Sequence, residues 1–131
     1  MYHLSYDERR QVYYVPNVAV VGCGGTGSLV AEGLCRLMVP QPDMKLLLVD
    51  HDRVEPHNLL RQAFYQEDVG RFKAEVLATR LAKLYGRPIC YSVQAFSQAY
   101  YGSSNSPIRS ARIVIGCVDN PMARAEIATS V

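Results

Sequence analysis

Three glycines near the start of the chain have the spacing of a phosphate-binding turn. Gly22, Gly24 and Gly27 fit G-x-G-x-x-G, and the apolar run Val18–Val21 leads directly into them. In such a turn the first glycine permits a tight bend, the second lets the backbone approach a phosphate, and the third lets a helix pack on a strand. Glycine-rich turns also form for purely geometric reasons, so the motif alone leaves a nucleotide cradle and a plain turn both open.

Two charged residues further along the chain favour the nucleotide cradle. Asp50 follows the apolar run 44–49, at the place where dinucleotide-type folds put an acid that accepts from a ribose hydroxyl. A carboxylate that only caps a turn is the alternative there. Lys73 begins a predicted helix, where a cation opposes the helix dipole, so a nearby anionic ligand would explain its position.

These residues are expected to meet at one edge of a parallel sheet, because ligands of open α/β sheets bind at the carboxyl ends of the strands. The polar groups predicted at that edge are the turn at 22–27, Asp50, Asn58, Arg61, Lys73 and Asp119. Two fixed cations that face a glycine turn, with an acid able to hold Mg²⁺, suit a triphosphate better than a nicotinamide dinucleotide.

The elements that must position this site follow from the apolar patterns. We expect strands at 18–21, 44–49, 88–95 and 113–115, and helices at 25–39, at 73–85 and from Asn120 to about Thr129. The apolar positions Leu29, Val30, Leu34, Leu37 and Met38 recur with helical spacing in the first helix. The second has Leu77, Leu81 and Leu84 on its apolar face and ends at Gly86. Alternation in 88–95 suits an edge strand.

The fold class that results is α/β. Right-handed strand–helix–strand units predict a Rossmann-like, open, mainly parallel sheet with flanking helices and strand order 3-2-1-4. We expect residues 1–131 to form one ATP-binding domain, with an N-terminal arm at 1–14 and a flexible loop at 97–111. The long connection at 53–72 is typical of a functional segment.

Composition excludes several functional classes. The net charge of +2, spread over intermixed acids and bases, gives no reason to expect nucleic acid as a partner. No apolar run is long enough to span a membrane and the N-terminus is no signal peptide, so we expect a cytoplasmic protein. The four cysteines form no C-x-x-C pair, which predicts no zinc site and favours buried free thiols.

Eight short motifs, in this order, carry a family resemblance. They are Gly22-Cys-Gly-Gly-Thr-Gly27, Asp50-His-Asp52, Val54-Glu55, Asn58-Leu-Leu-Arg-Gln62, Asp68-Val-Gly70, Lys73-Ala74, Asp119-Asn120 and Ala123-Arg124. From about residue 17 to 125 the chain resembles the ThiF/MoeB/ubiquitin-activating superfamily, and its glycine turn most resembles that of bacterial plasmid- or element-associated ThiF-like proteins. These adenylyltransferases activate the C-terminal glycine of ubiquitin-like or sulfur-carrier proteins.

The resemblance implies a role for each matching residue. The backbone at Gly22, Gly24, Gly25 and Gly27 would line ATP, with Gly25 closest, and Asp50 would bind the ribose hydroxyls. Asn58, Arg61 and Lys73 would contact the phosphates, Asp119 would serve the Mg²⁺-bound phosphates, and Asn120 would lie beside it. Arg61, Lys73 and Asp119 would be the catalytic residues. The family also implies a ubiquitin-like or sulfur-carrier partner, a homodimer or pseudo-dimer, and an upstream arginine for which Arg9 or Arg10 is a candidate.

Other features of the family have no match in the sequence. The crossover loop, the catalytic cysteine and the paired zinc cysteines are not found, and the run at 113–115 is apolar on both faces although its predicted place is an edge. We therefore expect a truncated nucleotide-binding half that more sequence or another subunit completes. A non-catalytic binding module and an NAD-binding oxidoreductase domain are the alternative functions; the latter leaves Asn58, Arg61 and Lys73 without a role.

Overall fold

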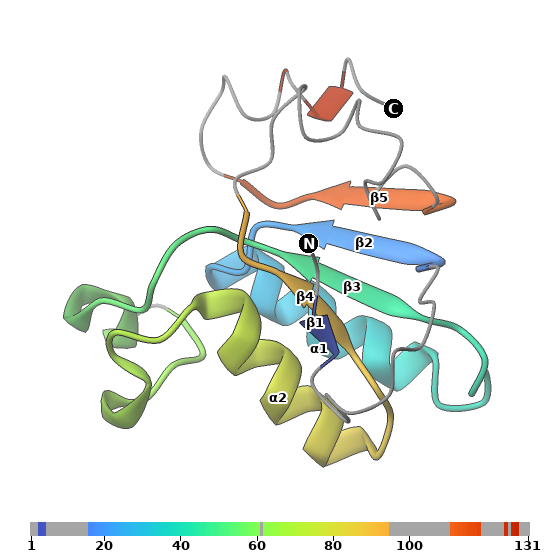
Figure 1. The fold of residues 1–131 in the computed structure, drawn as a ribbon, viewed down its shortest axis with the longest axis horizontal. Coiled ribbons are helices and arrows are strands. Elements are labelled where there is room, and N and C mark those ends of the chain that lie inside the picture. Colours follow the sequence, from blue (N-terminus) through green and yellow to red (C-terminus); the bar gives the residue numbers. More distant parts are fainter. Residues whose placement is uncertain are drawn as a thin grey trace.

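The computed structural model describes residues 3–4, 16–60, 62–94, 111–118, 125 and 127–128. These residues form one sheet with the strand order β1-β4-β3-β2-β5. Four of the strands, β2 (Val18–Val21), β3 (Leu46–Val49), β4 (Cys90–Ser92) and β5 (Ile113–Gly116), run parallel. The predicted Rossmann-like order 3-2-1-4 is therefore confirmed (Figure 1).

The fifth strand corrects one prediction. β1 (His3–Leu4) comes from the expected N-terminal arm and pairs antiparallel with β4, in the register His3 to Tyr91. β4 is consequently not an edge strand among the described residues, and all three of its residues are buried. The alternating sequence at 88–95 had predicted an edge strand. The neighbouring strand β1 could not be foreseen, because a two-residue strand carries no periodic signal of its own.

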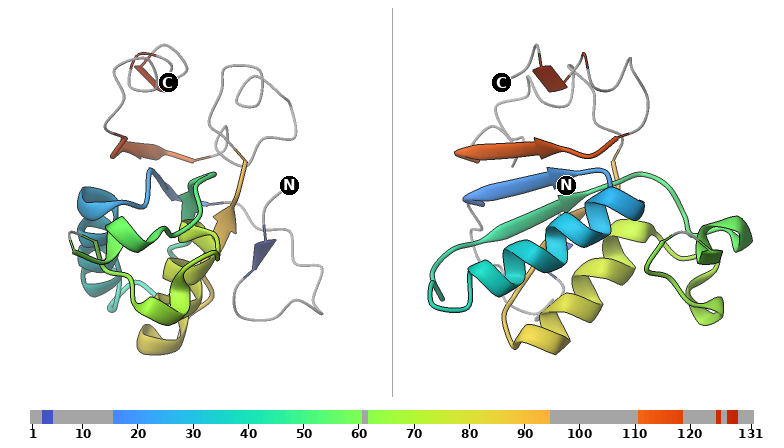
Figure 2. Two further views of the ribbon diagram at one scale, coloured as in Figure 1. Left: turned by 90° about the vertical axis from the view of Figure 1, so that its left-hand side faces the viewer. Right: turned by 180° about the vertical axis from the view of Figure 1, so that it is seen from behind.

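Two helices cover one face of the sheet. α1 (Gly25–Leu37) and α2 (Lys73–Tyr85) pack side by side against it (Figure 2). The central strands β2 and β3 are buried along their whole length, as continuous apolar runs predict for strands covered on both faces. On the other face, Ile127 packs with Ala19, Val21 and Leu47. None of the helices in the described ranges is long and apolar enough to cross a bilayer.

The helix faces differ from the prediction at three leucines. Leu29 and Leu37 of α1 are 72% and 75% exposed, and Leu84 near the end of α2 is 66% exposed. The small residues Ala31 and Cys35 are buried on the contact face of α1, and Val30, Leu34 and Met38 pack into the same core as predicted. The glycine turn fixes how α1 starts against the end of β2, and in that orientation Leu29 and Leu37 lie outside the contact face. Gly86 ends α2 in the left-handed conformation, as predicted.

The connection between β3 and α2 is a structured projection with its own small core. It contains the short 3-10 helices η1 (Pro56–Leu60) and η2 (Gln66–Asp68), and an antiparallel bridge between Arg53 and Phe72 closes its base. Its apolar side chains Val54 and Phe64 pack with Val76 of α2. The projection extends from the carboxyl-end side of the parallel strands, seen at the left of Figure 1.

Asp68 and Arg80 anchor this projection to α2. The buried Asp68 carboxylate accepts bonds of 3.1 and 2.8 Å from the Arg80 guanidinium and one from the Tyr65 main-chain amide. The guanidinium also lies over the Tyr65 ring. Arg80 Nη2 donates to both carboxylate oxygens and Nη1 donates to Ala63 O, and these charge-assisted bonds hold the projection in one orientation.

Candidate functional site

The glycine turn has the backbone geometry that its spacing predicted. Gly22 has φ +100°, a conformation that side chains other than glycine rarely adopt, and a Cβ on it would lie 2.8 Å from the Cys117 carbonyl carbon. A Cβ on Gly27 would collide with the carbonyl oxygen of Gly22. Gly22 therefore makes the bend, and Gly27 allows α1 to pack against the end of β2.

Hydrogen bonds hold the turn in place. Gly22 N donates to Val49 O at 2.7 Å, the Ser28 hydroxyl donates to Cys23 O at 3.1 Å, and Ser28 N donates to Gly24 O at 2.9 Å. Gly24 caps α1 without any side-chain bond, and no acid lies in the first turn of the helix. The N-terminus of α1 thus keeps its positive dipole end unopposed by any acid in that turn, as an anion site requires.

Asp50 joins the turn to the end of β3. Its Oδ2 accepts from Cys23 N at 2.7 Å, and its Oδ1 accepts from Asp52 N at 2.8 Å. Asp50 therefore does cap a turn, and it does so beside the glycine turn. Burial raises the pKa of Asp50, and the two main-chain bonds together with the charge of Lys73 act in the opposite direction.

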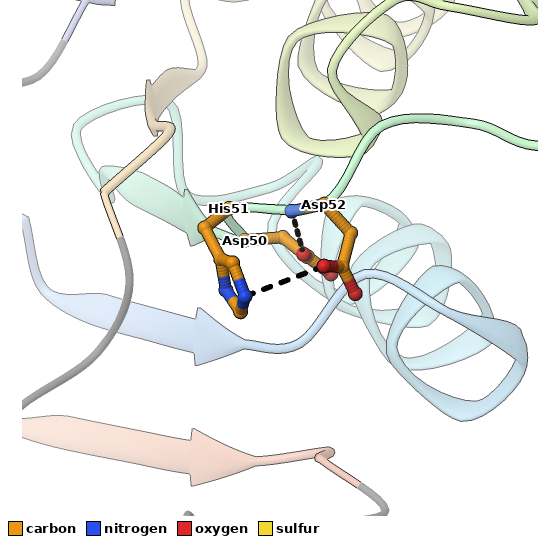
Figure 3. Close-up of side chains that lie close together, drawn as sticks. All are labelled: Asp50, His51 and Asp52. Atoms are coloured by element: carbon orange, nitrogen blue, oxygen red, sulfur yellow. Dashed lines mark hydrogen bonds and ion pairs between the residues drawn. The ribbon is translucent and has the colours of Figure 1, made fainter.

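The charged residues next to Asp50 form a hydrogen-bonded turn. His51 Nε2 and Asp52 Oδ1 lie 3.3 Å apart, and the ligand atoms of Asp50, His51 and Asp52 lie within 4.8 Å of one another (Figure 3). Both oxygens of Asp50 already accept main-chain bonds, and Asp52 pairs with His51. The chain's own contacts account for this cluster, and we assign no metal to it.

Lys73 is a buried cation at the edge of this turn. It is the first residue of α2 and is only 7% exposed, and its charge acts on both Asp50 and Cys23. Its main-chain amide donates to Asp52 O at 2.9 Å. Within the described ranges, no carboxylate lies at ion-pair distance from its ammonium group. A buried ammonium without a counter-ion is costly, which fits a site that receives an anion.

Asn58 and Gln62 come from the projection. Asn58 is buried, and its Oδ1 accepts from Glu55 N at 2.7 Å, which leaves its Nδ2 as the remaining donor. Gln62 N donates to Asn58 O at 3.0 Å, and the Gln62 carboxamide lies over Gly24. The sequence named Gln62 only as part of a motif, because no spacing rule for side chains singles it out.

The structure brings together the turn at 22–27, Asp50 and Lys73, with the end of η1 against the turn. Arg61, Asp119 and Asn120 lie outside the described residues, as do Arg9, Arg10 and residues 97–110 of the loop predicted at 97–111. Val118, the residue before Asp119, follows Cys117, whose amide donates to Val21 O at 2.7 Å beside the turn.

The four cysteines are free thiols, as predicted. Cys23, Cys35 and Cys90 are buried, and Cys117 is partly buried. Burial raises the pKa of every one of them, for Cys35 to about 11. None of the four has the lowered pKa of an activated nucleophile.

Comparison with known proteins decides the family. The model of the ThiF family matches residues 6–130. The chain belongs to the ThiF family. Among curated members, ubiquitin-like modifier-activating enzyme 5 of Culex quinquefasciatus is 33% identical over 94% of the chain, and that of Caenorhabditis briggsae is 35% identical over 84%. The chain spans 32% and 27% of those two proteins, about a third of their length.

Solved structures of ThiF-type proteins share the fold. The TcdA (CsdL) structure superposes with a TM-score of 0.73 at 27% identity, covering 86% of this chain and 44% of that one. E. coli tRNA N6-threonylcarbamoyladenosine dehydratase, TcdA, solved in complex with AMP, superposes with a TM-score of 0.72 at 27% identity. The match covers 84% of this chain and 44% of that one. The complex of the same protein with ATP superposes with a TM-score of 0.67 at 28% identity, covering 79% of this chain and 41% of that one. ThiF-family membership and these complexes support ATP binding and adenylyltransferase-type activity at the family level.

Proposed function

We propose that this chain supplies the ATP-binding half of an enzyme that adenylylates the C-terminal carboxylate of a ubiquitin-like or sulfur-carrier protein. The observation that carries the proposal is the buried Lys73, which has no ion-pair partner among the described residues and lies beside Asp50 and the glycine turn. A nucleotide phosphate would supply the missing counter-charge, and the ribose would reach Asp50. The names of the curated relatives support a ubiquitin-like partner.

Each group has a task in that reaction. A carboxylate oxygen of the carrier attacks the α-phosphorus, the bond from that phosphorus to the bridging oxygen breaks, and pyrophosphate leaves. Negative charge grows on the phosphate oxygens as this happens, and fixed donors that already face them lower the barrier without reorganising. Lys73 and the N-terminus of α1 are such donors, and we assign Arg61 and Asn58 to the same phosphates.

Asp50 and the glycine backbone have binding tasks. The Asp50 carboxylate is held by two main-chain amides and accepts bonds from the ribose hydroxyls. We assign the backbone at Gly22, Gly24, Gly25 and Gly27 to the nucleotide, because the bend at Gly22 and the close packing at Gly27 place the N-terminus of α1 at this turn. No side-chain nucleophile is needed for this half-reaction, in agreement with the raised pKa values of the thiols.

We further propose that Mg²⁺ accompanies the ATP phosphates. The proposal assigns it to Asp119, with Asn120 beside it. A hard cation with carboxylate and phosphate oxygen ligands neutralises the charge of the leaving group. The cytoplasmic location, the dimer and the absence of a nucleic-acid partner remain predictions from the sequence.

A non-catalytic ThiF-like module that only binds nucleotide or a partner is the second candidate. The chain spans about a third of its curated relatives, so the observed half can bind a nucleotide without holding every group that turnover needs. An NAD-binding oxidoreductase is disfavoured, because a dinucleotide held by the turn and Asp50 leaves the buried Lys73 unexplained.

Calorimetric titration with Mg·ATP tests the proposal, with Lys73→Met compared against Lys83→Met. Lys83 is an exposed lysine on the same helix, so its substitution controls for the loss of one charge. We expect Lys73→Met to weaken ATP binding by about 10- to 100-fold, the scale of a lost charge-assisted bond, and Lys83→Met to leave it unchanged. Equal affinity in both variants would refute the role of Lys73.

Pyrophosphate exchange separates the candidates. Exchange into ATP in the presence of a ubiquitin-like protein ending in glycine supports adenylylation. ATP binding without exchange supports the non-catalytic module, and tighter binding of NAD than of ATP supports the oxidoreductase.

A further inference from the structure

The side chain of Gln62 lies against the glycine turn with an unpaired polar atom. Its Nε2 is 3.3 Å, its Cδ 3.6 Å and its Oε1 3.7 Å from the point where a Cβ on Gly24 would stand. The carboxamide thus covers the residue that caps the N-terminus of α1. Its Oε1 is buried and has no hydrogen-bond partner, and it is the one such side-chain atom found among the described residues.

The fold gives no reason for a polar atom at this place. A buried acceptor without a donor destabilises the folded chain, and an apolar side chain of the same length would fill the space without that penalty. The main chain of Gln62, which donates to Asn58 O, would be the same with any other side chain. The unpaired acceptor therefore points to a ligand that brings a donor.

The chemistry of the reaction limits what that donor is. Phosphate oxygens are ionised and only accept, so the phosphates of ATP would offer no donor at the glycine turn. The ribose hydroxyls are assigned to Asp50, which is bonded to the turn at Cys23. Of the two substrates, the acyl substrate brings a donor close to the α-phosphate, because a C-terminal residue carries its peptide N–H one carbon away from the reacting carboxylate.

We propose that Gln62 is a specificity-determining residue that accepts a hydrogen bond from the peptide N–H of the C-terminal residue of the acyl substrate. This contact orients the carboxylate toward the α-phosphorus and distinguishes a peptide terminus from other carboxylates. The inference rests on the proposed function, since it needs a nucleotide in the turn.

Two stable analogues of an acyl-adenylate test the contact. The first is N-acetylglycyl-sulfamoyladenosine, which has the peptide N–H, and the second is acetoxyacetyl-sulfamoyladenosine, which has an ester oxygen in its place. Affinities for both, and for AMP and Mg·ATP, are measured on the wild-type chain, on Gln62→Met and on Gln66→Met. Methionine keeps the length of the side chain and removes the acceptor, and the exposed Gln66 of η2 is the matched control.

We expect the wild type and Gln66→Met to bind the N–H analogue about tenfold more tightly than the ester, the scale of one hydrogen bond in a buried site. Gln62→Met should bind the two analogues equally, should keep its affinity for AMP, and should melt at the same or a higher temperature. A structural glutamine would lower the melting temperature and leave the preference unchanged.

Equal binding of the two analogues by the wild type overturns the inference, whatever the variants do. A preference that survives in Gln62→Met overturns it as well. In both cases, the proposed function is still supported if the wild-type chain binds Mg·ATP. A wild-type chain that binds neither ATP nor AMP nor the analogues overturns both.

Discussion

The main-chain amide of Cys23 donates a 2.7 Å hydrogen bond to Oδ2 of Asp50, 27 residues further along the chain. This bond joins the glycine turn after β2 to the end of β3, so the group assigned to the ribose and the group assigned to the phosphates move as one unit. The second Asp50 oxygen accepts from Asp52 N, which leads into the projection. A single carboxylate therefore connects the three parts of the site.

Nucleotide affinity should depend on pH through Asp50. The ribose hydroxyls donate to the ionised carboxylate, so protonation of Asp50 should weaken binding as the pH falls through its pKa. Because burial raises that pKa, the loss should begin at a higher pH than for an ordinary carboxylate, whose pKa is about 3.9. The affinity of ATP, measured between about pH 4 and 7, gives the profile.

2′,3′-dideoxy-ATP is the control for this profile, because its phosphates titrate like those of ATP and it has no ribose hydroxyls. The extra loss of affinity at low pH should be present with ATP and absent with the dideoxy nucleotide. Identical profiles for the two nucleotides would show that Asp50 does not bind the ribose.

Gly27→Ala should destabilise the chain by about 2–4 kcal/mol, because its Cβ collides with the Gly22 carbonyl oxygen and the backbone of the turn must shift. Gly33 lies in the same helix with nothing near its Cβ position. Gly33→Ala should therefore stabilise the chain by about 0.5–1 kcal/mol, the ordinary gain in helix propensity. Chemical denaturation of both variants measures the difference, and equal effects would contradict the packing described for the turn.

Arg80→Ala should destabilise the chain by about 3 kcal/mol, because it leaves the Asp68 carboxylate, 2% exposed, without its cation. Arg71→Ala is the matched control, since Arg71 pairs with Glu75 on the surface and should contribute less than about 1 kcal/mol. Urea unfolding compares the two variants. If both substitutions lower the free energy of unfolding by the same amount, Arg80 does not anchor the projection.

The thiols should react slowly in the folded chain. The pKa of Cys35 is raised to about 11, which at pH 8 leaves it about a hundredfold less thiolate than a thiol of ordinary pKa. Titration with Ellman's reagent should show slow labelling in native buffer and four rapid equivalents in guanidinium, one for each cysteine. Rapid labelling of a native thiol would identify a nucleophile that the structure does not show.

Much of the fold could be predicted because its signals are local. Continuous apolar runs marked the buried strands β2 and β3, and Gly86 marked the end of α2. The exposed Leu29 and Leu37 were placed wrongly because periodicity shows that a helix has an apolar side, and the approach of the glycine turn decides which side meets the sheet. The pairing of His3–Leu4 with β4 was missed, because two residues give no pattern.

For the candidate site, residue types and spacing alone predicted that the glycine turn, Asp50 and Lys73 meet, because a tight glycine turn and a strand-end acid need particular residues at particular intervals. Tertiary structure decided which of these groups lack partners within the described chain. Lys73 is a buried cation without a counter-ion and Gln62 a buried acceptor without a donor, and neither follows from residue type. The cost of an unpaired buried group depends on what folds around it, and packing from distant parts of the chain determines that environment.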